Sequence, residues 1–111
     1  MTVTAKAIIE SKQAENAQTQ QYSADNCRTI IDKFTATNTS AGVVSLSVNL
    51  IPASGSFGDG NLIVKTKSLA GGETYTFPEI VGHVLNQGGT ISTLASAANS
   101  VTIRASGREI T

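Results

Sequence analysis

The stretch that decides the fold is VVSLSVNLI, residues 43–51. Its apolar side chains at 44, 46, 48 and 50 alternate with two serines and an asparagine. Apolar and polar side chains therefore fall on opposite faces of an extended chain. This pattern predicts a β-strand with one buried and one hydrated face. Pro52 and the Gly- and Ser-rich run 53–60 then end the strand.

Similar runs recur along the chain at short intervals, which is typical of an all-β domain. Within 27–38, Ile30, Ile31 and Phe34 cannot all share one face, so either a bulge lies near Ile31–Asp32 or both faces are covered. The turn residues 38–42 predict that 27–51 forms a hairpin, and Gly107 is a candidate second bulge. The further strands are expected at 3–9, 61–69, 73–77, 90–95 and 100–105.

One segment has helical spacing. Ile80 and Val84 lie four residues apart, as do Val81 and Leu85. Pro78 suits a first helical position, whereas Gly82 weakens a helix. We expect a short helical turn near 79–85 or an irregular crossover. The fold class predicted is a single-domain, jelly-roll-like antiparallel β-sandwich.

The N-terminal part of the chain differs from the rest. Residues 10–26 are poor in apolar side chains, and the run 11–21 contains only alanines among them. A helix there has no apolar stripe to bury. We expect one domain over 1–111, in which 1–26 is partly an extended polar arm. Two interpretations stay open, a solvated edge segment and an arm that becomes ordered on a partner.

Composition bounds the class of function. The 111 residues include 8 basic and 8 acidic side chains, so the formal net charge is zero, whereas nucleic-acid binders usually carry a basic excess. No apolar run approaches the roughly 20 residues that span a bilayer, and the N-terminus has no cleavage pattern. We therefore expect a protein made in the cytoplasm that binds neither nucleic acid nor membrane.

Residues for catalysis are sparse. His83 is the only histidine, and no carboxylate is placed in the sequence to orient it. Cys27 is the only cysteine, which excludes an internal disulfide and favours a buried thiol. A metal site needs several ligands at close spacing, and the glycine-rich stretches lack the Lys-Ser/Thr of a phosphate loop. We expect no enzyme, no cofactor and no metal.

Three segments carry a resemblance to a known family: CRTIIDKFTATN (27–38), GETYTFPEIVGHVL (72–85) and VTIRASGREIT (101–111). In these runs, its length and its strand pattern, the chain resembles the capsid decoration (cement) proteins of epsilon-fifteen-like podoviruses. The resemblance extends over nearly the whole chain and contains no catalytic signature. It implies a jelly-roll sandwich on the outside of a bacteriophage capsid that staples neighbouring major capsid subunits.

The resemblance also implies partners and a location. The expected partner is the major capsid protein, with the chain itself a homo-oligomer, favoured as a dimer, on the virion surface. The Phe57 loop and the polar segment 10–21 are the candidate contacts, although Phe57 could instead pack into the core. The alternatives are a neck or tail (head–tail connector) protein and, with little support, a carbohydrate-binding sandwich. The candidate contact residues are Gln13, Glu15, Gln18, Gln20, Gln21, Phe57, Arg104 and Arg108.

Overall fold

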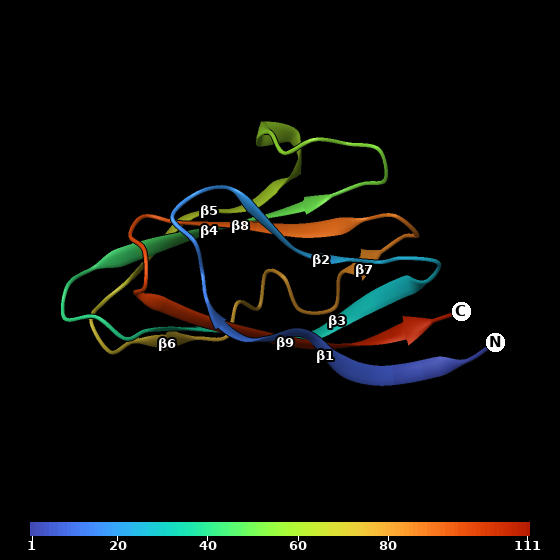
Figure 1. Cartoon of the computed structure of the whole chain (residues 1–111), viewed down its shortest axis with the longest axis horizontal. Coiled ribbons are helices and arrows are strands. Elements are labelled where there is room, and N and C mark those ends of the chain that lie inside the picture. The colour runs from blue at the N-terminus through green and yellow to red at the C-terminus, as the bar shows by residue number, and fades with distance from the viewer.

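The computed structural model describes all 111 residues, and nearly all regular structure in it is antiparallel β-strand. Two sheets pack face to face (Figure 1). The all-β sandwich predicted from the sequence is confirmed. The only helical element is a 3-10 helix at Asp59–Asn61. The strands are β1 (Val3–Gln13), β2 (Thr19–Ser23), β3 (Arg28–Asn38), β4 (Val44–Ile51), β5 (Leu62–Leu69), β6 (Thr74–Tyr75), β7 (Val84–Leu85), β8 (Thr90–Ala95) and β9 (Val101–Ile110).

The strand order is that of a jelly roll. The first sheet, here sheet A, has the order β1-β9-β3-β6, with β7 also paired to β3; the second, sheet B, has the order β2-β8-β4-β5. Because β6 and β7 pair with opposite ends of β3, they act as one interrupted edge strand. With that pair counted once, the eight strands follow the two Greek keys of a jelly roll. The chain ends lie side by side, since Thr2 and Thr111 exchange two backbone hydrogen bonds.

The predicted hairpin over 27–51 is wrong, because β3 belongs to sheet A and β4 to sheet B. The fully buried Asn38 carries the chain from one sheet to the other. Its Nδ2 donates to the carbonyl oxygens of Gly42 (2.7 Å) and Leu69 (2.9 Å), and its Oδ1 accepts from the Ser40 amide. These bonds hold the turn against the end of β5 in sheet B. The alternation of β3 and β4 fixes the buried face of each strand but not its neighbour.

The bulge predicted near Ile31–Asp32 is confirmed. The pairing of β3 with β9 shifts register between Ile31 and Lys33, so Ile31 and Phe34 both face the core and are fully buried. At Gly107, opposite Ile31, an added Cβ would clash with the carbonyl oxygen of Ile30. Gly107 therefore lies beside the bulge, which is in β3, and permits close packing of the two backbones there.

The segment near 79–85, expected as a short helical turn or an irregular crossover, consists of hydrogen-bonded turns over 77–83 followed by β7. The backbone bonds across to β3 there: the Ile31 amide donates to the His83 carbonyl (3.0 Å) and the Gly82 amide to the Ile31 carbonyl (2.7 Å). These bonds, with Gly82 at φ 90°, end any helix. Phe77, fully buried, packs edge-on against Phe34 at 5.1 Å between ring centroids. The segment thus fills the core as an irregular crossover.

The N-terminal segment is not an arm. β1 pairs with β9 from Val3 to Gln13, and β2 pairs with β8, so each forms an edge strand of one sheet. Ile8 and Ile9 in β1 and Tyr22 in β2 are buried in the common core. Of the two interpretations of this segment, the solvated edge is the one that describes the structure. Its outward-facing side chains are polar because one side of each strand faces water.

Candidate interaction surfaces

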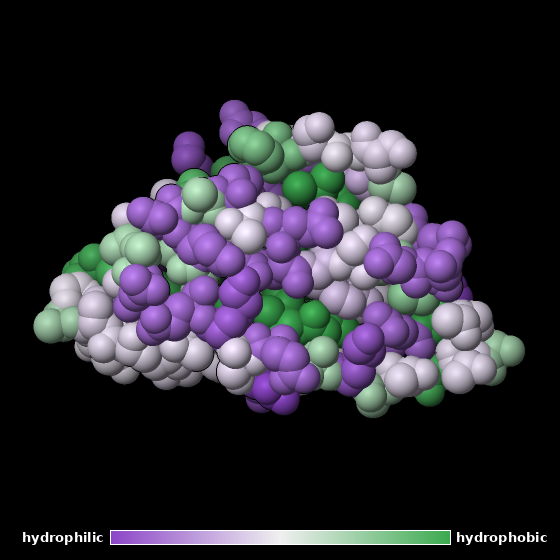
Figure 2. Space-filling model, in the orientation of Figure 1, coloured by the Kyte–Doolittle hydropathy of each residue, from purple (hydrophilic) through white to green (hydrophobic).

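Polar side chains bridge the opening between the edge strands β1 and β2. The Lys12 ammonium donates to one oxygen of Glu15 at 2.8 Å, and the Gln21 amide donates to the other at 2.9 Å. Gln21 also donates to Thr93 Oγ1 of β8 (3.0 Å). The bonds from Lys12 and then Gln21 hold the pKa of Glu15 below its usual value. Hydrophilic atoms dominate this side of the molecule (Figure 2).

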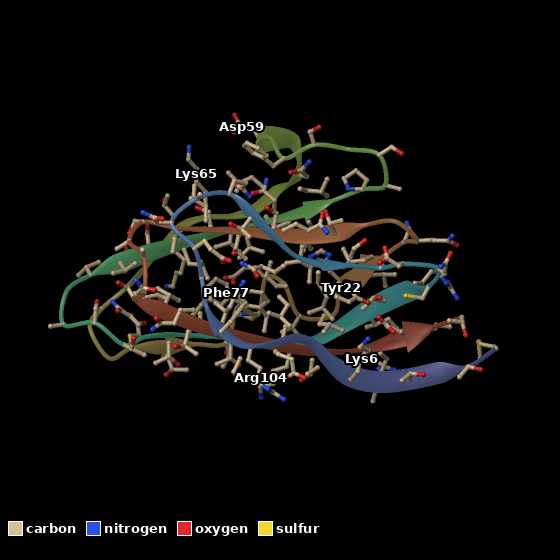
Figure 3. All side chains as sticks on the ribbon, viewed as in Figure 1. Lys6, Tyr22, Asp59, Lys65, Phe77 and Arg104 are labelled. Atoms are coloured by element: carbon tan, nitrogen blue, oxygen red, sulfur yellow. The ribbon has the colours of Figure 1, made fainter.

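A second bridge joins the sheets at the end where the termini lie. The Tyr22 hydroxyl donates to the Glu109 carboxylate and lies 2.7 Å from Thr29 Oγ1. Lys6 Nζ lies 3.5 Å from the same carboxylate. Tyr22 points from β2 toward sheet A (Figure 3). Burial and then the bond to Glu109 raise the pKa of Tyr22, so its hydroxyl remains a proton donor to Glu109.

A third network fixes the loop that joins β4 to β5, residues 52–61. Gln18 donates to Asn49 Oδ1 (3.2 Å) and to Ser92 Oγ (2.7 Å) on the outer face of sheet B. Asn49, 3% exposed, donates in turn to the Gly58 carbonyl (3.1 Å) and to Asn61 Oδ1 (2.7 Å). The loop therefore folds back over sheet B and covers part of its outer face, as Figure 1 shows.

Phe57 stands at the tip of this loop and is 61% exposed. Its neighbours are held by one side chain: Asn61 Nδ2 donates to the Ser56 carbonyl (2.9 Å) and Asn61 Oδ1 accepts from the Gly58 amide (3.2 Å). The backbone on both sides of the ring is thereby fixed. Of the two positions left open by the sequence, Phe57 takes the exposed one.

The outer face of sheet A is uncovered and rich in hydroxyl groups. On it Arg108 makes a bidentate pair with Asp32 (3.0 and 2.9 Å), which holds the pKa of Asp32 below its usual value. Arg104 pairs with Glu10 at 3.1 Å. A shallow hollow of about 330 Å³ lies beside Arg104, between β3 and β9. Its lining residues are Lys33, Thr35, Thr37, Thr102, Ile103, Arg104 and Ser106.

The structure does not gather the eight predicted contact residues into one patch. Arg104 and Arg108 lie on sheet A, whereas Phe57 projects from the sheet B side. The half-buried Glu15, Gln18 and Gln21 use their hydrogen bonds within the chain. Gln13 and Gln20 are exposed, and Gln13 donates to Thr39 at 3.3 Å. The alternation of polar and apolar residues did not indicate that glutamines of an edge strand would form hydrogen bonds within the chain.

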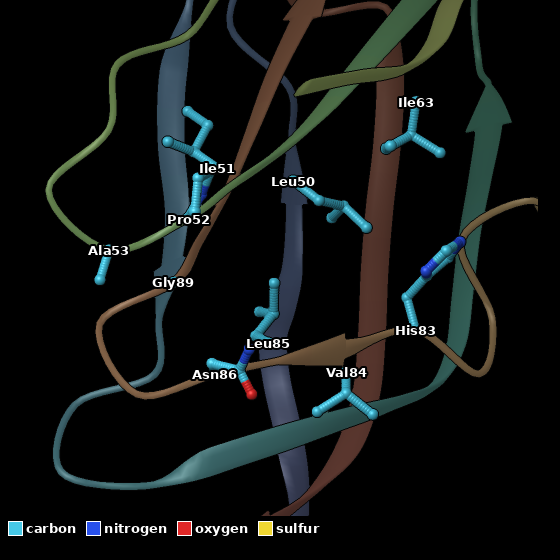
Figure 4. Close-up of a pocket in the computed structure, with 10 residues that line it drawn as sticks. All are labelled: Leu50, Ile51, Pro52, Ala53, Ile63, His83, Val84, Leu85, Asn86 and Gly89. Carbon is cyan, nitrogen blue, oxygen red and sulfur yellow. The ribbon is translucent and has the colours of Figure 1, made fainter. Parts of the chain in front are cut away.

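Sequence reasoning missed an apolar groove between the end of β4 and β7 (Figure 4). It lies on the side of the sandwich opposite the edge strands β1 and β2. Its volume is about 510 Å³. Leu50 and Leu85 lie in its middle, with Ile63 and His83 toward one end (Figure 4). The other residues that line it are Ile51, Pro52, Ala53, Val84, Asn86 and Gly89. No sequence pattern signals it, because it forms where two sheets diverge.

The only histidine and the only cysteine of the chain lie apart. His83 is exposed at the groove, whereas Cys27 is a free, buried thiol with its Sγ 3.6 Å from Thr29 Oγ1. No three His, Cys, Asp or Glu side chains are grouped so that they could hold a metal ion. No helix is long and apolar enough to cross a membrane.

Comparisons with known proteins bear on the fold. No protein-family model and no curated protein match the sequence. Among solved structures the chain is similar to one described as "Bacillus endospore appendages form a novel family of disulfide-linked pili". The TM-score is 0.57 at 15% sequence identity, over 99% of this chain and 88% of the other. At this identity the similarity shows a shared sandwich fold.

Proposed function

We propose that this chain is a structural protein of a bacteriophage particle that binds the outside of the capsid and staples neighbouring major capsid subunits. The observation that carries the proposal is the uncovered outer face of sheet A. Its hydroxyl groups and two ion pairs form a flat polar surface, whereas loop 52–61 covers part of the corresponding face of sheet B. Such surfaces suit wet contacts between folded proteins.

Two further points support an assembly role. The sequence resembles capsid decoration proteins in three segments, as described above. The structurally similar protein is described as a component of pili, which are repeating assemblies. The only cysteine of this chain is buried, with 5% of its surface exposed. In our proposal the subunits therefore associate through non-covalent contacts. Many copies on one shell turn modest contacts into a large total resistance to internal DNA pressure.

The test uses particles of a phage that encodes the chain. Shells made without it should release DNA at a lower temperature, and added purified protein should restore the wild-type temperature. Lys33→Glu with Thr35→Glu should weaken this rescue, because both residues line the sheet A hollow. The matched control is Lys65→Glu on β5 in sheet B, which should rescue fully. Equal stability of shells with and without the protein would overturn the proposal.

A neck or tail protein is the second candidate, since a jelly-roll sandwich can also form a ring. Copy number separates the two positions. A head decoration protein is present in numbers on the order of hundreds, whereas a ring contains about a dozen copies. Gel densitometry of purified virions against the major capsid protein gives this ratio directly.

A further inference from the structure

The groove between β4 and β7 is an open apolar surface that nothing in the chain fills. Six of its ten lining residues are hydrophobic. Val84 is 51% exposed and Ile63 39% exposed. Its volume of about 510 Å³ lies in the range of binding pockets, roughly 300–1,000 Å³. Exposed side chains of this size around one groove favour an occupant with a compact apolar group.

The same chain presents one such group. Phe57 is the only aromatic residue among its large exposed hydrophobic side chains. Asn61 holds the backbone at Ser56 and Gly58, so little conformational freedom is lost when the ring binds. Phe57 is not among the residues that line the groove but faces two hollows on sheet B. Phe57 of the same chain therefore does not fill the groove.

The polar groups beside the two features can form a hydrogen bond with each other. Asp59 is the only charged residue in loop 52–61, and it projects away from the sandwich (Figure 3). His83 is the only titratable residue that lines the groove, and no carboxylate lies there to repel Asp59. An imidazole N–H can donate to a carboxylate. The net charge of zero adds no general repulsion between copies.

We infer that Phe57 of one copy of this chain binds in the β4–β7 groove of a second copy, with Asp59 directed toward His83. Phe57 and the groove are different parts of the surface, so the contact is heterologous unless a two-fold axis pairs both at once. A heterologous contact links copies in series around a ring or across a shell. The inference is independent of the proposed function, because it needs only two copies and no capsid.

The size of the contact sets its strength. A fully buried aromatic side chain removes about 150–250 Å² from water, far below the ~800 Å² per partner of a standard stable interface. Isolated copies should therefore associate only weakly. When a surface holds the copies next to each other, their effective concentration rises and the contact becomes populated. Copies of the chain would therefore remain separate before assembly and would bind one another once a surface holds them side by side.

Disulfide trapping tests a weak contact of this kind. One population carries Ser56→Cys, which leaves the Phe57 ring in place, and a second, of different mass, carries Val84→Cys. Both are mixed at high concentration under mild oxidation, and mass spectrometry identifies the bond formed. The matched control replaces the second population with Val43→Cys, since Val43 is 70% exposed in the turn between β3 and β4. All three substituted side chains are exposed, so each variant should fold.

The expected result is a 56–84 disulfide that forms about tenfold faster than the 56–43 disulfide, because the bound Phe57 ring holds positions 56 and 84 close together and one aromatic anchor contributes a factor of at least this size. In a second measurement, sedimentation of the unmodified chain at millimolar concentration should show association that Phe57→Ser removes and Val43→Ser retains. Equal trapping at 84 and 43 would overturn the inference, as would association unaffected by Phe57→Ser. Neither result would affect binding to the capsid through sheet A, which is measured separately.

Discussion

At the scale of single residues, the Tyr22 hydroxyl connects the two sheets through hydrogen bonds. It donates to Glu109 on β9 and lies 2.7 Å from Thr29 Oγ1 on β3. Thr29 is fully buried, and its other hydrogen-bonding neighbour is the weak Cys27 thiol at 3.6 Å. Loss of the Tyr22 hydroxyl leaves a buried oxygen without a strong partner, which is a costly defect.

Tyr22→Phe should therefore lower the free energy of unfolding by about 1–3 kcal/mol. Urea denaturation measures this as a lower midpoint at an unchanged slope. Tyr75→Phe is the matched control, because it also removes a hydroxyl bonded to a glutamate, here Glu79 at 2.7 Å, but on the surface. The control should change the stability by less than about 0.5 kcal/mol. Equal losses of stability in the two variants would show that the buried hydrogen bonds of Tyr22 contribute no more to stability than the surface bond of Tyr75.

At the scale of elements, two carboxylates join neighbouring strands, and both have lowered pKa values. Glu15 bonds to Lys12 of β1 and Gln21 of β2. Asp32, in the β3 bulge, pairs with Arg108 of β9. A carboxylate whose pKa is lower in the folded than in the unfolded chain stabilises the fold above the unfolded pKa. That stabilisation is lost as the pH falls through the folded pKa.

The stability should therefore be constant near neutral pH and fall as the pH drops below about 4.5, the ordinary value for a glutamate. Asp32→Asn should reduce this acid dependence, because the neutral amide has no carboxylate proton to gain. Asp59→Asn is the control, since Asp59 forms no ion pair and should leave the slope unchanged. Unfolding midpoints in urea between pH 7 and pH 3 measure all three proteins. An Asp32→Asn profile that matches the unchanged chain would contradict this account.

How much of the elements the sequence predicts depends on what a local pattern encodes. The strand over 90–95 was predicted with its observed bounds, and 43–51 differs from β4 by one residue, because alternation is a property of a strand alone. The bulge near Ile31 was one of two interpretations of three apolar residues that cannot all share one face of a strand. The crossing from β3 to β4 did not, since it depends on Asn38 meeting Leu69, far along the chain. The groove likewise forms from residues of distant segments.

The candidate contacts divide in the same way. Phe57 is an apolar side chain within a Gly- and Ser-rich loop, and that local contrast identifies it as a surface candidate. Glu15 and Gln21 have the same polar character whether they bond to a partner or to Thr93 of the same chain. Only the packing of β1 against β2 distinguishes the two possibilities. The structure shows these side chains bonded within the chain, and their role as partner contacts stays a prediction.

At the scale of the whole molecule, the topology requires the two ends of the chain to meet. Val3 pairs with Ile110 across the β1–β9 ladder, which spans nearly the full sequence. The entropy of closing such a loop must be lost before the ladder forms, so folds of this kind are slow. The fold has an extent of 45 × 26 × 20 Å, and its central strand β9 lies between the first and third strands of the chain.

A circular permutant tests whether this closure limits the folding rate. Thr111 and Thr2 already exchange two backbone hydrogen bonds, so an Asn-Gly pair in place of Met1 can join them as a two-residue hairpin turn. New ends between the exposed Ala98 and Asn99 leave loop 52–61 and the groove intact. In the permutant β9 directly precedes β1, and their ladder becomes a local hairpin.

The permutant should refold faster than the original chain in stopped-flow experiments, because its contacts are closer in sequence. The control keeps the original order of strands and carries the same Asn-Gly pair as an N-terminal extension. Refolding of the permutant at the control rate would show that pairing of the chain ends follows the rate-limiting step.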